Sequence, residues 1–266
     1  MRALTLFALL TLAGFRGVSA QPTALAHAHA HNDYVHARPL LDALERGFNS
    51  VEADIYLVGG RLLVAHSRDS VDAMRTLESL YLAPLRAYVQ QHGGRAFPGT
   101  GPLTLLIDVK ADSEGSYVVL DALLRRYADL FTIDAGGEVI EGPVVAIISG
   151  ARAIGTMGKA RVRFAGIDGR IADLHADARA SRTLMPLISD TWDRITKWKG
   201  VGEMPANVKG DVAQVVELAH KHGQRVRFWG TPDNEVVWQL LLDAKVDLIG
   251  ADDLDALRDF LTRPRQ

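Results

Sequence analysis

The protein is a chain of 266 residues with a formal net charge of −2 and a sequence pI near 6.5. Hydrophobic residues make up 48% and charged residues 23% of the sequence, a composition that supplies one sizeable core and excludes extensive disorder. The nearly balanced charge argues against a nucleic-acid-binding protein, and the absence of cysteine excludes disulfides and thiol catalysis.

Residues 1–20 have the pattern of a secretory signal peptide: a basic start, an apolar stretch and the small residues Val18-Ser19-Ala20 at the cleavage site. The apolar stretch is shorter than the ~20 residues of a membrane helix, and Arg16 interrupts it. We therefore predict cleavage near Gln21, export of the mature chain (21–266) to the periplasm or the exterior, and no transmembrane segment after cleavage.

Beyond the leader, short β-type runs alternate with longer amphipathic stretches, which is typical of a parallel sheet whose strands are joined by helices. The expected strands cover residues 24–31, 50–57, 103–109, 144–149, 164–167, 185–189, 225–229 and 246–249. The expected helices cover residues 39–46, 77–91, 117–130, 151–157, 211–222, 234–243 and 254–261. This alternation predicts a single α/β domain folded as a TIM-type (β/α)₈ barrel.

Turn and helix-end signals place several of these boundaries. Gly59-Gly60 predicts a tight hairpin turn, so residues 61–66 should return beside the second strand. Thr231-Pro232-Asp233 predicts a helix start with threonine as the N-cap, and Gly223 predicts a helix end. The hairpin matters most, because it returns His66 to the end of a barrel strand.

Polar residues gather at the predicted ends of the first three strands, where a TIM barrel assembles its active site. Glu52 and Asp54 are two residues apart, so a strand points both carboxylates to the same face. Two carboxylates that face a barrel interior repel each other unless a cation lies between them. Asp108, followed by Lys110, repeats the pattern on the third strand. Oxygen ligands of this kind predict a hard divalent cation, Mg²⁺ or Ca²⁺, rather than zinc.

Each residue also has a structural alternative when it is considered singly. A Glu-x-Asp pair on a strand is often solvated or salt-bridged, and a strand-end aspartate often caps a helix. His66 can be a hydrogen-bonded structural histidine, His29 can simply point into the barrel, and Trp229 at the end of the seventh strand can belong to the core. The joint placement of acids and histidines on the first three strands favours a functional site.

An ordered set of motifs runs through the chain: His31-Asn32-Asp33-Tyr34, Ser50-Val51-Glu52-Ala53-Asp54, Leu63-Val64-Ala65-His66 and Leu106-Ile107-Asp108-Val109-Lys110. Further matching segments at residues 197–200, 227–229 and 246–254 extend the likeness over nearly all of the mature chain. These motifs resemble the PI-PLC-like phosphodiesterase superfamily, which includes glycerophosphodiester phosphodiesterases. Within it, the chain is most similar to the branch of the altered inheritance of mitochondria protein 6 family.

The resemblance implies a metal-dependent phosphodiester hydrolase of the phospholipase C-like kind, acting on a small or lipid-derived phosphodiester. The residues that it implies are His31 and His66 as general acid and base, Asn32, Glu52, Asp54 and Asp108 as ligands of Mg²⁺ or Ca²⁺, and Lys110 and Trp229 as substrate-binding residues. The His-Arg-Gly and Pro-Glu-Asn motifs of typical glycerophosphodiester phosphodiesterases are absent, and no segment resembles a lipid-inserting helix, so neither substrate class is assigned.

Two other functions fit part of the sequence. An amidohydrolase-like metal-dependent hydrolase also begins its metal site with a His-x-His such as that of His29 and His31. It needs further strand-end histidines, however, and His175, His220 and His222 are expected in a loop or a helix. The second alternative is a non-catalytic exported metal-binding barrel, against which the intact acid and base positions argue. Zinc dependence would favour the amidohydrolase.

Overall fold

The computed structural model describes residues 22–176 and 180–264. The signal peptide predicted at residues 1–20 lies outside this range, so its cleavage and the export of the chain stay predictions from the sequence. None of the helices in the described range combines the length and the apolar character that a membrane crossing requires.

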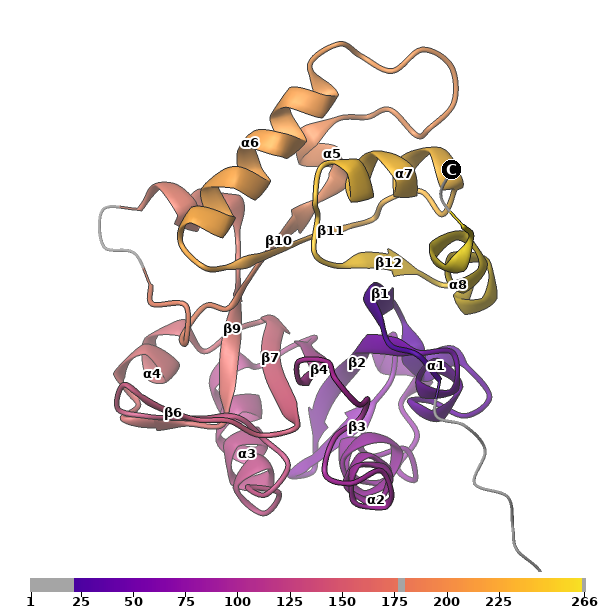
Figure 1. Ribbon diagram of the computed structural model, residues 1–266. Helices are drawn as coiled ribbons and strands as arrows, with labels where there is room; N and C mark the ends of the chain where they lie inside the picture. The colour runs from indigo at the N-terminus through magenta and orange to yellow at the C-terminus, as the bar shows by residue number, and fades with distance from the viewer. Residues whose placement is uncertain (1–21, 177–179, 265–266) are drawn as a thin grey trace, which may run out of the picture.

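Eight parallel strands form the nearly closed barrel of a TIM-type fold (Figure 1), in the order β11-β10-β9-β7-β4-β2-β1-β12. They are β1 (Leu25–Ala30), β2 (Phe48–Val58), β4 (Leu103–Val109), β7 (Val144–Gly150), β9 (Ala165–Gly169), β10 (Leu187–Thr191), β11 (Arg225–Trp229) and β12 (Ile249–Ala251). A parallel bridge between Arg227 and Leu248 brings the two ends of the ring together. The predicted fold and its eight strands are confirmed.

Helices surround the barrel and cover the outer face of its strands (Figure 1). They are α1 (Leu41–Glu45), α2 (Ala83–Gln91), α3 (Ser113–Arg125), α4 (Ile154–Lys159), α5 (Trp192–Ile195), α6 (Val208–Lys221), α7 (Glu235–Asp243) and α8 (Leu254–Thr262). Short turns of 3₁₀- or π-helix complete the set: η1 (Asp33–Val35), η2 (Arg68–Ser70), η3 (Glu78–Leu82) and η4 (Ile171–His175). The sequence did not predict α5, because a single helical turn is too short to display a 3.6-residue period.

The hairpin after β2 has the predicted form. Gly59 and Gly60 both have positive φ, 55° and 75°, as a type I′ turn requires, and β3 (Arg61–Val64) runs antiparallel to β2. A second antiparallel sheet, made of β5 (Ile133–Ala135), β6 (Glu138–Ile140) and β8 (Val162–Arg163), was not predicted. Its strands are only two or three residues long, too short to show alternation.

The predicted helix end at Gly223 is confirmed, and the predicted helix start at Pro232 is wrong. Helix α6 ends just before Gly223, whose φ of 70° is the left-handed conformation typical of glycine after a helix. Helix α7 starts at Glu235 rather than at Pro232, because the side chain of Asn234 accepts a hydrogen bond from the Val237 N–H (3.0 Å) and thereby caps the helix.

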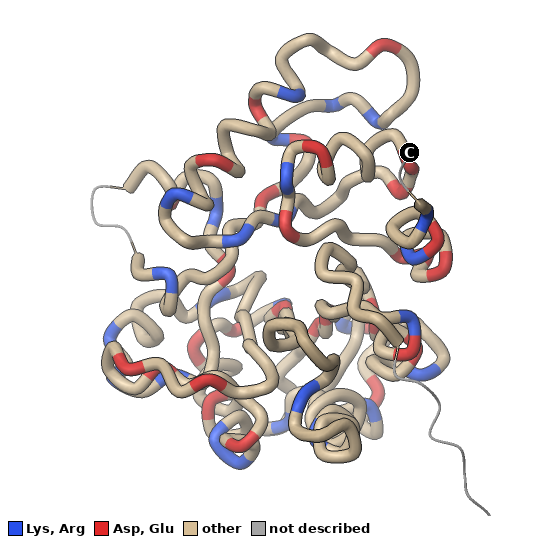
Figure 2. The backbone as a smooth tube through the Cα atoms, in the orientation of Figure 1, with Lys and Arg blue, Asp and Glu red and all other residues tan. Residues whose placement is uncertain are grey.

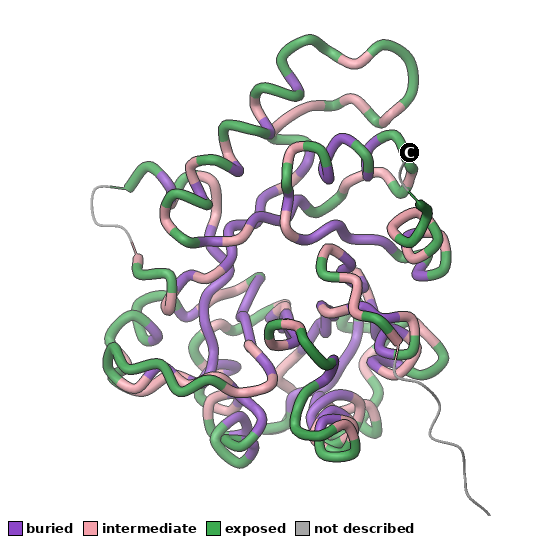
Figure 3. The backbone as a smooth tube through the Cα atoms, in the orientation of Figure 1, coloured by how far each residue is buried: buried purple, intermediate pink, exposed green. Residues whose placement is uncertain are grey.

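The buried residues lie mainly on the barrel strands and on the inner faces of the helices, whereas the connecting loops are exposed (Figure 3). Along β2 the outward-facing Val51, Ala53 and Ile55 join the large core beneath the helices, because successive side chains of a strand point to opposite faces. Inside the barrel a small apolar cluster comprises Leu106, Ile147, Leu187 and Leu248. One inward position beyond Leu106 along β4, Asp108 replaces the apolar side chain, so the barrel interior becomes polar toward the carboxyl ends of its strands.

Candidate active site at the carboxyl ends of the strands

Three carboxylates meet at the carboxyl ends of β2 and β4. Asp54 pairs in register with Asp108, and Glu52 precedes Asp54 on the same face of β2. Each of the three acids offers one oxygen within 4.8 Å of those of the other two. Glu52 and Asp54 are buried, while Asp108 is partly exposed toward the mouth of the barrel. The predicted carboxylates therefore lie together in a group that can hold a divalent cation.

Asp54 lies at the centre of this group with one carboxylate oxygen available. Its Oδ2 accepts hydrogen bonds from the Tyr34 hydroxyl (2.6 Å) and from Nζ of Lys110 (2.8 Å). Its Oδ1 is buried without a hydrogen-bond partner in the described part of the chain. Burial raises the pKa of Asp54 to about 6, although Lys110 and Tyr34 act in the opposite direction. A buried carboxylate with an unused oxygen fits a metal ligand.

Glu52 is held by two basic side chains. Its Oε2 accepts hydrogen bonds from Nη2 of Arg227 (2.6 Å) and from Nε2 of His29 (3.1 Å). Burial alone would raise the pKa of Glu52, but Arg227 and then His29 hold it well below its usual range. Nδ1 of His29 lies 2.7 Å from the Ser50 hydroxyl, which fixes the ring. Glu52 therefore remains a carboxylate, and both of its hydrogen bonds to the described residues use Oε2.

His29 makes a prediction about stability and pH. Burial, and then the nearby Arg227, lowers its pKa to about 4. Between pH 6.5 and 4 the unfolded chain therefore binds a proton that the native chain does not. In this window we expect His29 to reduce the free energy of unfolding as the pH falls, by up to about 1.4 kcal/mol per pH unit. Urea unfolding in EDTA at pH 7, 6 and 5 should give a shallower pH dependence for His29→Gln than for the wild type. Equal slopes would contradict the prediction.

His31 lies beside the carboxylate group, at the end of β1. Its Nδ1 is 2.7 Å from Oδ1 of Asp252, which follows β12. A proton on Nδ1 that is donated to Asp252 leaves Nε2 unprotonated in the neutral ring. The next residue, Asn32, adopts a left-handed conformation (φ 47°), which asparagine tolerates better than most residues. Its Nδ2 donates to the same Asp252 oxygen (3.3 Å), so both side chains are oriented from β12.

His66 lies on the other side of the group, and Tyr34 connects it to the candidate ligands. The Tyr34 hydroxyl lies 2.9 Å from Nδ1 of His66, 2.6 Å from Oδ2 of Asp54 and 2.5 Å from Oδ1 of Asn32. A hydroxyl has one proton, so Tyr34 can donate only one of these three hydrogen bonds at a time. His66 itself is 69% exposed and reaches into the mouth of the barrel.

Lys110 and Trp229, the two predicted substrate-binding residues, lie on different sides of the mouth. Nζ of Lys110 is 2.8 Å from Asp54 and 3.3 Å from Asp108. Burial alone would lower the pKa of Lys110, but Asp108 and Asp54 raise it. Trp229 is 42% exposed and lines a pocket of about 360 Å³ together with His31. The structure thus places Trp229 on the surface of the mouth and outside the core.

The position of Trp229 leads to a second prediction. Because the indole is exposed, Trp229→Phe should change the free energy of unfolding by less than about 0.5 kcal/mol. Loss of part of an aromatic contact with the substrate should lower kcat/KM roughly 2- to 10-fold. Steady-state kinetics and thermal unfolding of the same preparation measure both quantities. A large drop in the melting temperature with unchanged kinetics would mark Trp229 as a structural residue instead.

Four residues of this site were not assigned by the sequence: Tyr34, Arg227, Asp252 and the buried His29. Tyr34, Arg227 and Asp252 belong to segments that carried the family resemblance, but nothing in their local pattern identified their partners. A charged residue at an inward position of a strand, such as Arg227, is the signal that could have been used. The carboxylate to which it binds lies 175 positions away along the chain.

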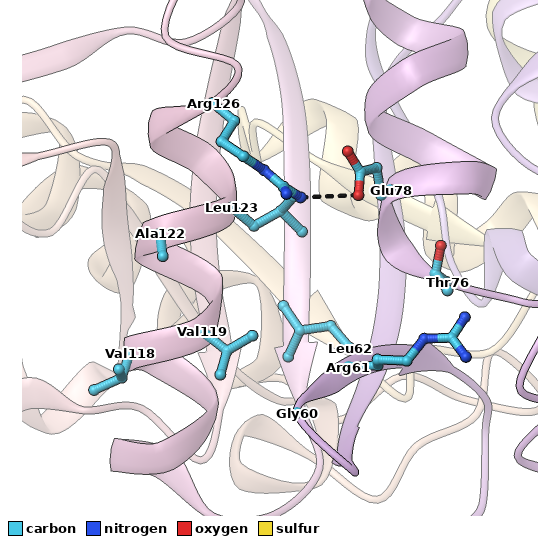
Figure 4. Close-up of a pocket in the computed structure, with 10 residues that line it drawn as sticks. All are labelled: Gly60, Arg61, Leu62, Thr76, Glu78, Val118, Val119, Ala122, Leu123 and Arg126. Carbon is cyan, nitrogen blue, oxygen red and sulfur yellow. Dashed lines mark hydrogen bonds and ion pairs between the residues drawn. The ribbon is translucent and has the colours of Figure 1, made fainter.

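A groove larger than the pocket beside Trp229 lies elsewhere on the surface. It has a volume of about 610 Å³ and lies between β3 and α3, where Leu62, Val119 and Leu123 form its floor and Glu78 bonds to Arg126 at its rim (Figure 4). It contains none of the grouped carboxylates or strand-end histidines. Acidic and basic residues alternate over the rest of the chain without a large region of one sign (Figure 2). The carboxyl ends of the strands are therefore the candidate active site.

The histidines that the amidohydrolase alternative needs do not join this group. His175 ends η4, and His220 lies in α6, where its Nε2 is 2.8 Å from Oδ2 of Asp247. Among the described residues, the candidate metal group consists of carboxylates alone. Oxygen ligands favour Mg²⁺ or Ca²⁺, whereas histidine-rich sets favour zinc and related metals.

Comparison of the amino-acid sequence with known proteins identifies a family and several relatives. A family model described as "AIM6-like phosphodiesterase domain" matches residues 19–163, more than half of the chain. Altered inheritance of mitochondria protein 6 from Eremothecium gossypii is 28% identical over 89% of this chain and 69% of its own length. The homolog from Arthroderma benhamiae is 28% identical over 87% of this chain and 82% of its own length.

Solved structures with the same fold include two glycerophosphodiester phosphodiesterases. The protein from Agrobacterium tumefaciens superimposes with a TM-score of 0.54 at 15% identity and covers 89% of this chain and 99% of its own. The protein from Parabacteroides distasonis gives a TM-score of 0.53 at 13% identity, over 90% and 98%. At this level of identity the likeness establishes the barrel fold alone.

Proposed function

Since the chain belongs to the AIM6-like phosphodiesterase domain family, we propose that it is a divalent-metal-dependent phosphodiester hydrolase in which two histidines serve as general acid and base. The observation that carries this proposal is the group of Glu52, Asp54 and Asp108, whose ligand oxygens lie within 4.8 Å of one another. Its substrate is a small or lipid-derived phosphodiester, and the predicted leader implies that it acts outside the cytoplasm.

The donor set fits a hard divalent cation. Glu52, Asp54 and Asp108 would hold it, with Asn32 as a further oxygen ligand once the Tyr34 hydroxyl turns fully to Asp54. Support comes from the buried Oδ1 of Asp54, which has no hydrogen-bond partner in the described range. When bound there, Mg²⁺ or Ca²⁺ supplies charge neutralisation at an oxygen of the phosphate.

The side chains around this group supply the rest of the chemistry. Lys110, already beside Asp54 and Asp108, neutralises negative charge that grows on the phosphate oxygens in the transition state. His31 takes the proton of the nucleophile at Nε2, and Asp252 stabilises the imidazolium that results. His66 donates a proton to the leaving alkoxide, and Tyr34 orients its ring. The nucleophile is water or a neighbouring hydroxyl of the substrate, which would give a cyclic phosphate.

The test of this function is hydrolysis of bis(p-nitrophenyl) phosphate by the purified protein. Activity should disappear in EDTA and return with Mg²⁺ or Ca²⁺, and the monoester p-nitrophenyl phosphate should react far more slowly. Return of activity with zinc alone would favour the amidohydrolase alternative. Metal binding without hydrolysis of any phosphodiester would favour the non-catalytic barrel.

A further inference from the structure

A second polar cluster lies at the carboxyl ends of β7, β9 and β10, and the proposed mechanism does not use it. Its centre is Asp168, which is fully buried. Oδ2 of Asp168 accepts hydrogen bonds from the hydroxyls of Ser149 (2.6 Å) and Ser189 (2.5 Å) and from Nη1 of Arg170 (2.9 Å). Oδ1 of the same carboxylate is buried without a partner in the described range. Asp168 thus anchors Arg170 at the mouth of the barrel.

Arg152, which follows β7, is the unusual member of this cluster. Its Nη1 donates to the backbone carbonyl of Asp168, and no carboxylate lies within ion-pair distance of its guanidinium among residues 22–176 and 180–264. Burial, and then the neighbouring Arg170, lowers the pKa of Arg152. A partly buried cation that faces a second cation is costly unless an anion lies nearby. Arg170 pairs with Asp168 (2.9 Å), whereas the charge of Arg152 is offset only by the more distant carboxylates of Asp168, Asp173 and Asp190.

The two guanidinium groups have donors to spare. Within the described range, the side-chain hydrogen bonds of Arg152 and Arg170 all leave from Nη1. A guanidinium has five N–H donors, and Nε and Nη2 of both residues make no hydrogen bond to the described residues. The planar fork that they form matches the oxygens of a phosphate or a carboxylate, which it can bind through two parallel hydrogen bonds.

This pair lies within reach of the candidate metal group. Asp108 on β4 pairs in register with Ser149 on β7, and the Ser149 hydroxyl bonds to Asp168 on β9. Neighbouring strands are ~4.8 Å apart, so Asp108 and Asp168 are separated by two spacings, about 10 Å. A phosphodiester at the carboxylate group could therefore place a second anion, two or three carbon atoms away, beside Arg152 and Arg170.

We propose that Arg152 and Arg170 form a subsite for a second anionic group, a phosphate or a carboxylate, carried by one of the two alcohol parts of the phosphodiester substrate. This inference rests on the proposed hydrolase function, because it takes the group of Glu52, Asp54 and Asp108 as the place where the ester phosphate binds. It narrows the substrate class to phosphodiesters with an additional negative charge close to the ester.

Calorimetric titration tests the subsite without depending on turnover. The probes are propyl phosphate, with one anionic group, and 1,3-propanediol bisphosphate and 3-carboxypropyl phosphate, each with two. In saturating Mg²⁺ the wild type should bind at least one of the two-anion probes about 10- to 100-fold more tightly than propyl phosphate, the gain expected of a charged hydrogen-bond pair. The two-anion probe that binds more tightly than propyl phosphate identifies the second anion as phosphate or carboxylate.

The variants assign the gain to the two arginines. Arg152→Gln should lose most of the increase in affinity for the two-anion probe. Arg170→Lys should reduce this increase while keeping a cation beside Asp168. Arg194→Gln, which removes a neighbouring exposed charge that pairs with Asp190 (3.0 Å), should keep it. Absence of a gain in the wild type, or equal losses in the Arg152 and Arg194 variants, would overturn the subsite. Hydrolysis of bis(p-nitrophenyl) phosphate by the wild type decides the hydrolase function separately, because this substrate carries no second anion.

Discussion

Replacement of His31 or His66 by alanine is expected to lower the turnover of a phosphodiester by roughly two to four orders of magnitude, the usual contribution of a general acid or base. Both residues lie at the mouth of the barrel, and each has an Nδ1 atom within hydrogen-bond distance of an orienting group, Asp252 for His31 and the Tyr34 hydroxyl for His66. The pH profile of the wild-type turnover should be bell-shaped. His220→Ala, a histidine of α6 that pairs with Asp247, is the matched control and should retain activity.

A change of leaving group separates the two roles. A very acidic leaving alcohol hardly needs protonation, so His66→Ala should recover much of its activity on a p-nitrophenyl ester relative to an alkyl ester. His31→Ala should not recover, because it lacks the base. The opposite pattern would exchange the two assignments. Normal turnover in both variants, or loss of metal binding in both, would remove the acid–base mechanism and reopen the case for histidine ligands.

Substitution of Glu52 by glutamine is expected to lower metal affinity and activity together. Glu52 is one of three carboxylates in the candidate group, and Arg227 and His29 hold it as a carboxylate. Removal of a side chain that hydrogen-bonds to a metal ligand typically lowers the affinity for the metal 10- to 100-fold. Removal of the charge of the ligand itself should therefore lower it at least about 100-fold. Excess Mg²⁺ should restore part of the activity, because the other two carboxylates remain.

The matched control for this substitution is Asp190→Asn. Asp190 is also a buried strand-end acid, but it pairs with Arg194 and lies outside the metal group. Calorimetric titration with Mg²⁺ and Ca²⁺ compares the two variants. Equal metal affinity in Glu52→Gln and the wild type would show that Glu52 is a structural partner of Arg227, and the assignment of the metal group would be wrong.

The amino-acid sequence alone determined the features that depend on neighbours along the chain. Glu52 and Asp54 share a face because a strand has a period of two, and the buried Val51, Ala53 and Ile55 occupy the other face. The Gly59-Gly60 turn returns β3 beside β2, because glycine adopts the positive φ angles that this turn requires. The eight strands were found by composition and alternation, and their number predicted the barrel.

Only the tertiary structure decided which side chains meet. The Asp252 carboxylate lies beside His31 across 221 positions of the sequence, and Arg227 reaches Glu52 across 175. Both contacts exist because β11 and β12 come together and β12 pairs with β1, which brings the last strands of the chain beside the first. The cluster of Arg152, Asp168 and Arg170 arises in the same way from the pairing of β7 with β9. A local pattern identifies the face on which a residue lies, but closure of the barrel selects its partner, because sequence distance does not encode spatial distance around a ring.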